Sequence, residues 1–301
     1  MGVTPRPLVV TLFGAACCLF GGACGNTVLE VGQAQPGYQF GTPRLLSELD
    51  TGYANENPTL TADLLELFFT SGRGDNSADV WTARRTSAQD PFGAPSLVSE
   101  VSTSAFETSP AISLDGLTLY YGSDQSGGAG EVDIWQVTRP DRGSSWGDLQ
   151  NVAPLNSPAK DIPRPLGQHE LVMPLGSQRD SGVGYETFLA ARPSVGQPFG
   201  APTMVAGLAS AQDAVADAFL TGDGLTLFYA VTPQDDSPDL FMATRASTTA
   251  AFSQPTPLTQ LNTDSEERDP WLSPDGTTFF FSSNRGGNLQ IYEVSVTQQA
   301  P

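Results

Sequence analysis

Residues 258–296 read LTQLNTDSEERDPWLSPDGTTFFFSSNRGGNLQIYEVSV, and this stretch holds every part of a pattern that recurs along the chain. The pattern is an acidic cluster, a proline, a short apolar strand, an Asp-Gly pair, a strongly apolar strand, a Ser-x-Arg-Gly loop and a strand with an aromatic residue. Asp-Gly favours a tight hairpin, because glycine accepts positive φ. The stretch therefore predicts three consecutive strands joined by short turns.

Four earlier copies of this pattern precede it. The aromatic residues of the five cycles stand at positions 81, 135, 188, 241 and 292, and an arginine closes the first four cycles at positions 84, 139, 192 and 245. A period of about 53 residues over most of the chain indicates a repeat architecture. Asp63-Leu64 and His169-Glu170 occupy the Asp-Gly position of the first and third cycles. We therefore expect those two turns to differ from the others.

A fourth segment recurs between the cycles, as in PFGAPSLVSEV at 91–101. Each copy contains proline, which cannot donate to a central ladder, so the segment predicts an edge strand. A further copy, QFGTPRLLSEL at 39–49, precedes the first cycle, whereas the last cycle ends at Val296 without one. A ring of blades must close or expose an edge. We expect an all-β, five-bladed β-propeller of four-stranded antiparallel blades over residues 38–297, closed by an N-terminal strand that completes the last blade.

The amino terminus has the composition of an export signal. Arg6 precedes an apolar run from Leu8 to Phe20, and small residues follow it up to Ala23. The run is too short to span a bilayer as a helix. We expect residues 1–23 to be a signal peptide.

The segment LFGGAC, which ends at Cys24, resembles the lipobox of bacterial lipoproteins, with Gly21 where leucine is usual. Two outcomes fit this segment. Either Cys24 is lipidated and residues 24–37 tether the anchored domain, or ordinary cleavage leaves a secreted protein. A cysteine at this place in a chain with none beyond it favours lipidation.

Composition and charge exclude several classes of function. The net charge is −19 and the isoelectric point about 4.1, so the surface repels phosphate backbones and nucleic acid is not expected as a partner. The three cysteines lie at positions 17, 18 and 24, which leaves the folded body without a disulfide or a thiolate metal site. The single histidine, His169, would have to support alone any His-based zinc site or Ser-His-Asp triad.

Two cycles carry a family resemblance. The segments SPDGTTFFFSSNRGG at 273–287 and SLDGLTLYYGSDQSGG at 113–128 resemble the TolB-type, WD-repeat-like propeller repeat, and the resemblance covers about residues 39–296. The segment LNTDSEERDPWLSPDG at 261–276 is similar to copies in bacterial envelope lipoproteins. The resemblance implies a propeller of the bacterial envelope, in the periplasm or at the cell surface.

Acidic residues gather just ahead of the first strand of each cycle. In a propeller this strand lines the central channel, so these carboxylates are expected to ring one mouth of the channel. Converging carboxylates can bind Ca²⁺ or a basic partner segment; alternatively they cap turns and stay solvated. No other cofactor is expected. The candidates are Glu56, Glu107, Asp161, Asp217, Glu267 and Asp269.

No catalytic constellation stands out. A glycosidase needs two carboxylates with separate roles, whereas these acids occupy equivalent positions of a repeat. The sequence favours a non-catalytic, monomeric binding or scaffold propeller, anchored to the outer membrane through Cys24, that presents its loop face and acidic mouth to an envelope protein or peptide. The alternative is a carbohydrate-binding or glycoside-hydrolase-like five-bladed propeller.

Overall fold

The computed structural model describes residues 37–299 apart from 74–77, 180–183, 210–212 and 235. These residues belong to one compact unit. The expected signal peptide, Cys24 and the tether up to residue 36 lie outside the described residues. Within the described ranges no helix has the length and apolar character that a membrane span requires.

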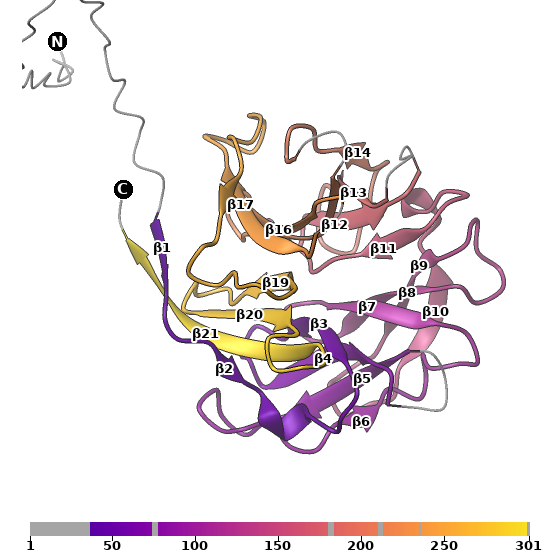
Figure 1. The fold of residues 1–301 in the computed structure, drawn as a ribbon. Helices are drawn as coiled ribbons and strands as arrows, with labels where there is room; N and C mark the ends of the chain where they lie inside the picture. The colour runs from indigo at the N-terminus through magenta and orange to yellow at the C-terminus, as the bar shows by residue number, and fades with distance from the viewer. Residues whose placement is uncertain (1–36, 74–77, 180–183, 210–212, 235, 300–301) are drawn as a thin grey trace, which may run out of the picture. The chain divides into compact units, whose positions relative to one another are not determined.

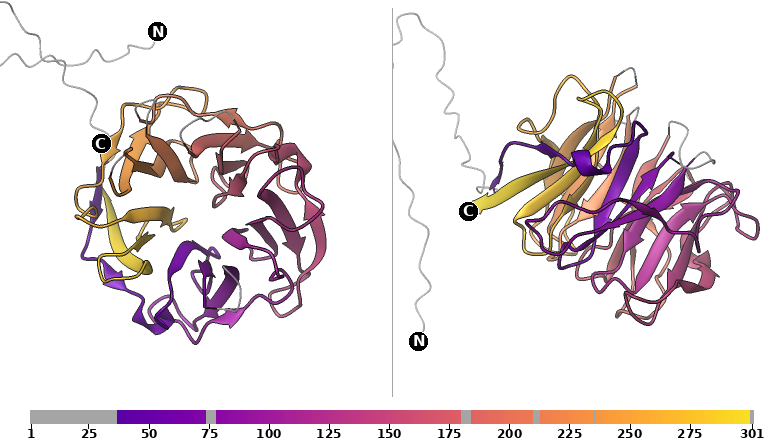
Figure 2. Two further views of the ribbon diagram at one scale, coloured as in Figure 1. Left: turned by 45° about the vertical axis from the view of Figure 1, so that its right-hand side comes forward. Right: turned by 90° about the horizontal axis from the view of Figure 1, so that it is seen from below.

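Five antiparallel sheets stand around a common axis as the blades of a propeller (Figure 1, Figure 2), which confirms the expected fold. The innermost strands are β3 (Asn55–Leu60), β7 (Glu107–Ile112), β11 (Asp161–Pro163), β15 (Ala214–Leu220) and β19 (Glu267–Leu272). The second strands are β4 (Glu66–Ser71), β8 (Thr118–Ser123), β12 (Val172–Ser177), β16 (Thr226–Thr232) and β20 (Thr278–Ser283). The third strands are β5 (Asp79–Arg84), β9 (Asp133–Thr138), β13 (Glu186–Ala191), β17 (Asp239–Thr244) and β21 (Gln290–Gln299).

The outer strands are short. Those of the first four blades are β6 (Ser96–Leu97), β10 (Gly147–Asn151), β14 (Thr203–Met204) and β18 (Thr256–Pro257). Short 3-10 turns follow β2 and β10, at Ser47–Leu49 and Ala153–Leu155. Three of these four edges have only two residues and offer little backbone for pairing with another chain.

The amino-terminal segment closes the ring. Strands β1 (Gly37–Phe40) and β2 (Arg44–Leu45) both pair antiparallel with β21, as expected from the displaced copy of the outer-strand sequence. Phe40 packs edge-on against Phe279 with ring centroids 5.2 Å apart, and Tyr38 reaches Phe228 of the fourth blade at 5.0 Å. The first residues of the described chain therefore hold the last blade and its neighbour.

Four of the five hairpin turns between first and second strands share one arrangement. In the second blade the Ser113 hydroxyl donates to Asp115, which also accepts from the Leu117 amide, and Gly116 has φ of 77°. The first blade has the same arrangement, with Thr61 donating to Asp63 and Leu64 in the left-handed region at φ of 61°. The expectation that this turn differs was therefore wrong.

The third turn does differ. Gln168, His169 and Glu170 all have positive φ, between 49° and 66°. The Glu170 side chain accepts from the Leu114 amide of the second blade. The irregular turn thus supplies a contact between blades.

A repeated arginine locks each of the first four blades. Its Nε donates to a carbonyl of the hairpin turn, and its guanidinium lies 4.3–4.6 Å from the ring centroid of an aromatic residue that precedes the outer strand. Such a desolvated cation–π contact contributes about 1–2 kcal/mol. The pairs are Arg85–Phe92, Arg139–Trp146, Arg192–Phe199 and Arg245–Phe252. The register expected for the first blade, Arg84, was wrong by one residue.

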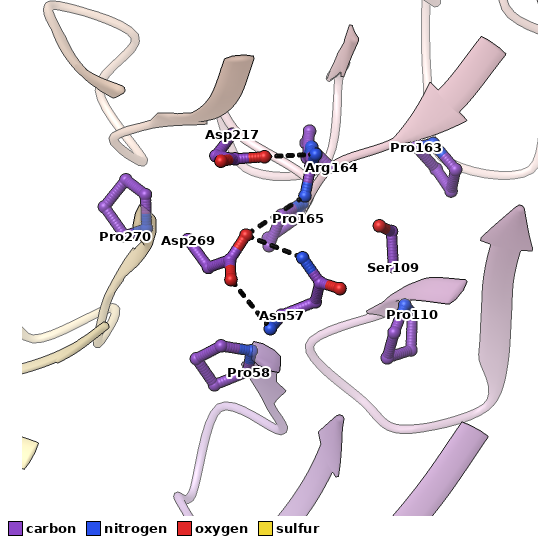
Figure 3. A pocket seen from close by; sticks show the side chains of 10 residues that line it. All are labelled: Asn57, Pro58, Ser109, Pro110, Pro163, Arg164, Pro165, Asp217, Asp269 and Pro270. Atoms are coloured by element: carbon purple, nitrogen blue, oxygen red, sulfur yellow. Dashed lines mark hydrogen bonds and ion pairs between the residues drawn. The ribbon is translucent and has the colours of Figure 1, made fainter. Parts of the chain in front are cut away.

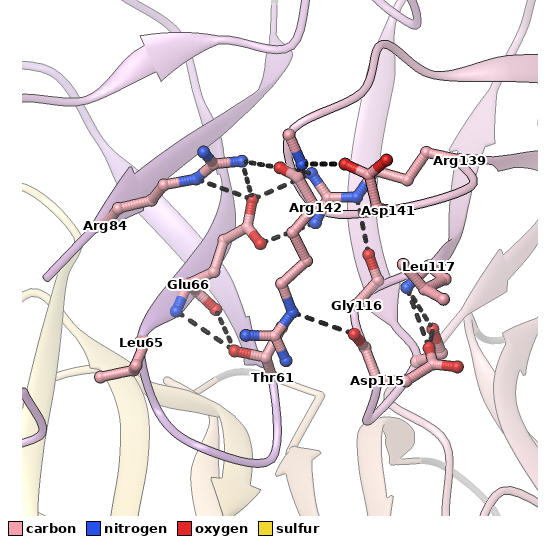
Figure 4. A network of polar contacts seen from close by, with 12 residues as sticks. Thr61, Leu65, Glu66, Arg84, Asp115, Gly116, Leu117, Arg139, Asp141 and Arg142 are labelled. Carbon is pink, nitrogen blue, oxygen red and sulfur yellow. Dashed lines mark hydrogen bonds and ion pairs between the residues drawn. The ribbon is translucent and has the colours of Figure 1, made fainter. Parts of the chain in front are cut away.

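Arg84 instead joins a polar clamp between the first two blades (Figure 4). Glu66, on β4, accepts from Arg84 at 2.7 Å and from Arg139 at 2.6 Å, and the Arg139 and Glu66 side chains are only 2% and 3% exposed. Arg142 bridges Asp63 and the Asp115 carbonyl. The clamp thus joins β4 of the first blade to residues that follow β9 of the second, and loss of Arg139 would leave the buried Glu66 carboxylate with one partner fewer.

We predict that deletion of residues 38–49 destabilises the whole propeller. The deletion exposes the edge of β21 and removes the Phe40 and Tyr38 ring contacts. Thermal unfolding followed by circular dichroism should show a large fall in melting temperature. Tyr53→Ala, at an exposed position outside the closing strands, is the control and should leave the transition in place. An unchanged melting temperature after the deletion would show that these strands do not close the ring.

Candidate binding site in the central channel

A β-bulge recurs on the innermost strand of four blades. The residue at the bulge is polar and has a positive φ of 51–57°, and the strand register shifts there. Bulges re-aim side chains, and aspartate and asparagine tolerate the left-handed conformation better than most residues. The four residues are Asn57, Ser109, Asp217 and Asp269.

The third blade breaks this pattern because Pro163 stands at the bulge position. Proline fixes φ near −65°, so β11 runs on without a bulge and the Arg164 amide continues the ladder by donating to the Pro174 carbonyl at 2.9 Å. The position after Pro163 thus places the Arg164 side chain in the channel.

Arg164 reaches the neighbouring fourth blade and the fifth blade (Figure 3). Its guanidinium pairs with Asp217 on β15 and with Asp269 on β19, the latter at 3.3 Å. Asp269 also accepts from the Asn57 side-chain amide at 2.6 Å and from the Asn57 backbone at 3.0 Å. This network joins four of the five blades, and we call Asn57, Arg164, Asp217 and Asp269 the floor.

Above the floor lies an open hollow of about 660 Å³, which we call the cup. Its charged lining residues are Glu56, Asp124, Glu131, Lys160, Arg164, Asp217, Arg268 and Asp269, and its aromatic ones are Phe106 and Tyr185. A second hollow of only about 10 Å³ shares the floor residues and is otherwise lined by Ser109 and by prolines. That volume has room for about one water molecule.

Only three of the six acidic residues expected at the channel mouth line the cup. These are Glu56, Asp217 and Asp269. Glu56 is one residue further along its strand than Glu107, Asp161 and Glu267 are along theirs. Side chains alternate in direction along a strand, so the two positions face different sides.

The other three acids fasten loops inside the blades. Glu107, Asp161 and Glu267 are fully buried and accept hydrogen bonds from serine hydroxyls of the second strands. Arg179 and Arg285 also donate to Asp161 and Glu267, at 2.5 and 3.0 Å. These three carboxylates are therefore turn-capping groups and cannot meet a ligand in the cup.

Sequence reasoning missed Asn57, Arg164 and Arg268. A signal was present, because Asn57, Ser109 and Asp269 each precede a proline at the same place in the repeat. In the third blade the order is reversed, because Pro163 comes before the polar residue Arg164. This is the blade whose arginine belongs to the floor.

Burial and neighbouring charges perturb two carboxylates of the cup. Burial, together with the nearby charge of Asp269, raises the pKa of Glu56 to about 7, although Arg268 opposes the shift. Burial likewise raises the pKa of Asp217 to about 6 against the effect of Arg164. The Glu56 side chain is 30% exposed, so this titrating carboxylate is open to the cup.

The described ranges contain no group of three or more His, Cys, Asp or Glu side chains that could hold a metal ion. In the floor, Arg164 occupies the place between two carboxylates where a cation would sit. The geometry therefore gives the possible Ca²⁺ site no support.

No protein-family model matches the chain, and no curated protein matches it either. Solved structures do resemble it. An endo-arabinase from Bacteroides thetaiotaomicron superposes with a TM-score of 0.59 at 12% identity, over 85% of this chain and 96% of that one. TolB from Acinetobacter baumannii gives 0.53 at 14% identity, over 83% of this chain, which spans 56% of that TolB. An α-L-arabinofuranosidase from Podospora anserina gives 0.55 at 10% identity, over 84% and 95%.

These likenesses show the fold alone. They are consistent with the resemblance to TolB-type propeller repeats. They also show that carbohydrate-active enzymes share the architecture, so the choice between binding and hydrolysis depends on the residues of the cup.

We predict that Glu56→Gln stabilises the propeller at high pH. The folded state keeps the proton on Glu56 up to about pH 7, whereas the unfolded chain releases it near 4.5. The free energy of unfolding of the wild type should therefore fall as pH rises through this window, because the folded state then binds more protons. Urea unfolding at pH 8 should find Glu56→Gln more stable than wild type, with the difference lost below pH 4.5. If the difference in free energy of unfolding between wild type and variant were the same at both pH values, the raised pKa of Glu56 would be contradicted.

Proposed function

We propose that this protein is a non-catalytic binding propeller of the bacterial cell envelope, whose cup receives a segment of a protein or peptide partner. One observation carries the proposal. Of the three carboxylates at or beside the floor, Glu56 alone makes no hydrogen bond to the described residues, whereas Asp217 and Asp269 share Arg164. The cup therefore offers one carboxylate that is held only by a long ion pair with Arg268, 4.0 Å away, in a wide hollow above a fixed floor.

This arrangement suits binding better than glycoside hydrolysis. A glycosidase uses one carboxyl group as acid and a second as base or nucleophile. Asp269 is held by Asn57 and Arg164 and its side chain is 2% exposed, while Asp217 is 11% exposed and paired. Neither is free to activate a water or attack a sugar.

A carbohydrate ligand is the second candidate, and specific features favour it. Phe106 and Tyr185 line the cup and could stack on a sugar ring, and the raised pKa of Glu56 suits a proton donor. Release of reducing sugar from arabinan by the wild type, lost in Glu56→Gln, would establish this candidate in place of the binding function.

The proposal includes location and anchoring. The charged start, the apolar run and the small residues before Cys24 support export, and LFGGAC supports a lipid anchor on the outer membrane. The partner is accordingly an envelope protein or peptide that a monomer binds. Nucleic acid is not expected, given the net charge of −19.

Obstruction of the cup tests the binding function. Ala216 lines the cup and is partly exposed, so Ala216→Trp should fill the hollow without entering the core. A partner captured from envelope extract and then purified should bind the wild type directly and bind Ala216→Trp at least tenfold more weakly. Val195→Trp, at an exposed turn outside the cup, is the control and should bind normally. Equal binding of the partner by all three proteins would exclude the cup.

The lipid anchor is tested separately. Metabolic labelling with a fatty-acid probe should mark the wild type, and Cys24→Ser should lose the label and leave the membrane fraction, because its only candidate acceptor is gone. Expression of both forms should be matched by immunoblot. Equal labelling of the two would rule out lipidation at Cys24.

A further inference from the structure

The surroundings of the floor carry more carboxylates than cations. Each of two arginines faces two carboxylates: Arg164 faces Asp217 and Asp269, and Arg268 faces Glu56 and Glu266. The two guanidinium groups therefore face four carboxylates, of which Asp217 and Asp269 are only 11% and 2% exposed. Unbalanced charge in such a place is costly, and a proton or a bound cation relieves it.

Glu56 is the carboxylate that a cation can reach. The nearest cationic atom, Nη1 of Arg268, lies 4.0 Å from its Oε2, and the Glu56 side chain is 30% exposed to the cup. Lys160 does not supply the missing charge, because it pairs with Glu131 at 3.7 Å.

The cation that fits is organic. A hard metal ion needs several converging oxygen ligands, and the described residues hold no group of three or more acidic, histidine or cysteine side chains that could supply them. An ammonium group needs only one carboxylate and a few hydrogen-bond acceptors, which Glu56 and the cup wall can provide.

Arg164 does not take Glu56 away from such a ligand. Its side chain is 8% exposed and lines the cup, and its guanidinium is paired with Asp217 and Asp269. Its Nε–H is buried and has no acceptor among the described residues. Arg164 therefore belongs to the floor, and Glu56 is the carboxylate that remains open to a ligand in the cup.

We infer that the cup binds its partner through a primary ammonium group, from a peptide amino terminus or a lysine side chain, seated against the Glu56 carboxylate. The inference rests on the proposed function and names the chemistry that the partner presents. Binding then replaces the proton on Glu56 with the ligand's cation.

Three short Gly/Ser peptides with amidated carboxyl ends test this inference by isothermal titration calorimetry on the full chain. One has a free amino terminus, one is acetylated and contains a single lysine, and one is acetylated without lysine. We expect the first, the second or both to bind and the third not to bind. The two binding arms distinguish the amino terminus from the side chain as the source of the ammonium group.

Two further readouts separate an ion pair from a merely structural effect. Titrations at pH 7 in phosphate and in Tris should differ in heat, because binding releases the Glu56 proton to the buffer. Glu56→Gln should weaken binding at least tenfold and abolish the buffer dependence. Glu100→Gln, the same substitution at an exposed site outside the cup, should do neither.

Binding of the acetylated lysine-free peptide, equal affinity in Glu56→Gln, or no binding of any peptide would each overturn the inference. Such a failure is distinguishable from failure of the proposed function. If the purified partner still binds the wild type and not Ala216→Trp, the cup is a binding site for some other chemistry. If the partner binds both, the cup itself is excluded.

Discussion

The pairing of β1 and β2 with β21 is the constraint on which the rest of the molecule depends. Each blade packs on its two neighbours, so an open ring would leave the first and fifth blades each with a bare face and β21 with a free edge. The closing segment also buries Phe40, and full burial of a phenylalanine side chain contributes about 2–3 kcal/mol. The arginine locks and the Glu66 clamp then keep each blade and its neighbour in register.

The sequence predicted the fold because the same sequence motif occurs five times, so no single residue decides the interpretation. The apolar second strands, the Asp-Gly turns and the displaced QFGTPRLLSEL segment each pointed to the same ring, and the structure confirms it. Errors arose where one residue decided the outcome. Arg84 and Arg85 are adjacent, and only the contact of Arg85 with Phe92 shows which one belongs to the repeat. Leu64 adopts a conformation usually reserved for glycine because Thr61 and Asp63 fix the turn around it.

The site was harder to predict, since it depends on exceptions to the repeat. Alternation along the strand separates Glu56, which faces the cup, from Glu107, which is buried one position earlier in the repeat. The four bulges could not be read from periodicity, because a bulge adds a residue without changing the period of the chain. In the third blade Pro163 stands where the other blades have the bulge, and Arg164 reaches the axis. The third blade thus differs from the other four at one position of the repeat, and this difference places an arginine in the floor.

Closure by β1 also has a consequence for how the molecule is made. Gly37 pairs with Gln299, so contacts at the two ends of the described chain are among the most non-local that the sequence allows. Non-local contacts slow folding, because the intervening loop must close before they form. A chain synthesised or exported from its amino terminus must therefore hold β1 and β2 unpaired until the fifth blade has emerged. The ring is completed only when β21 is available for pairing, so a chain that stops before β21 cannot close it.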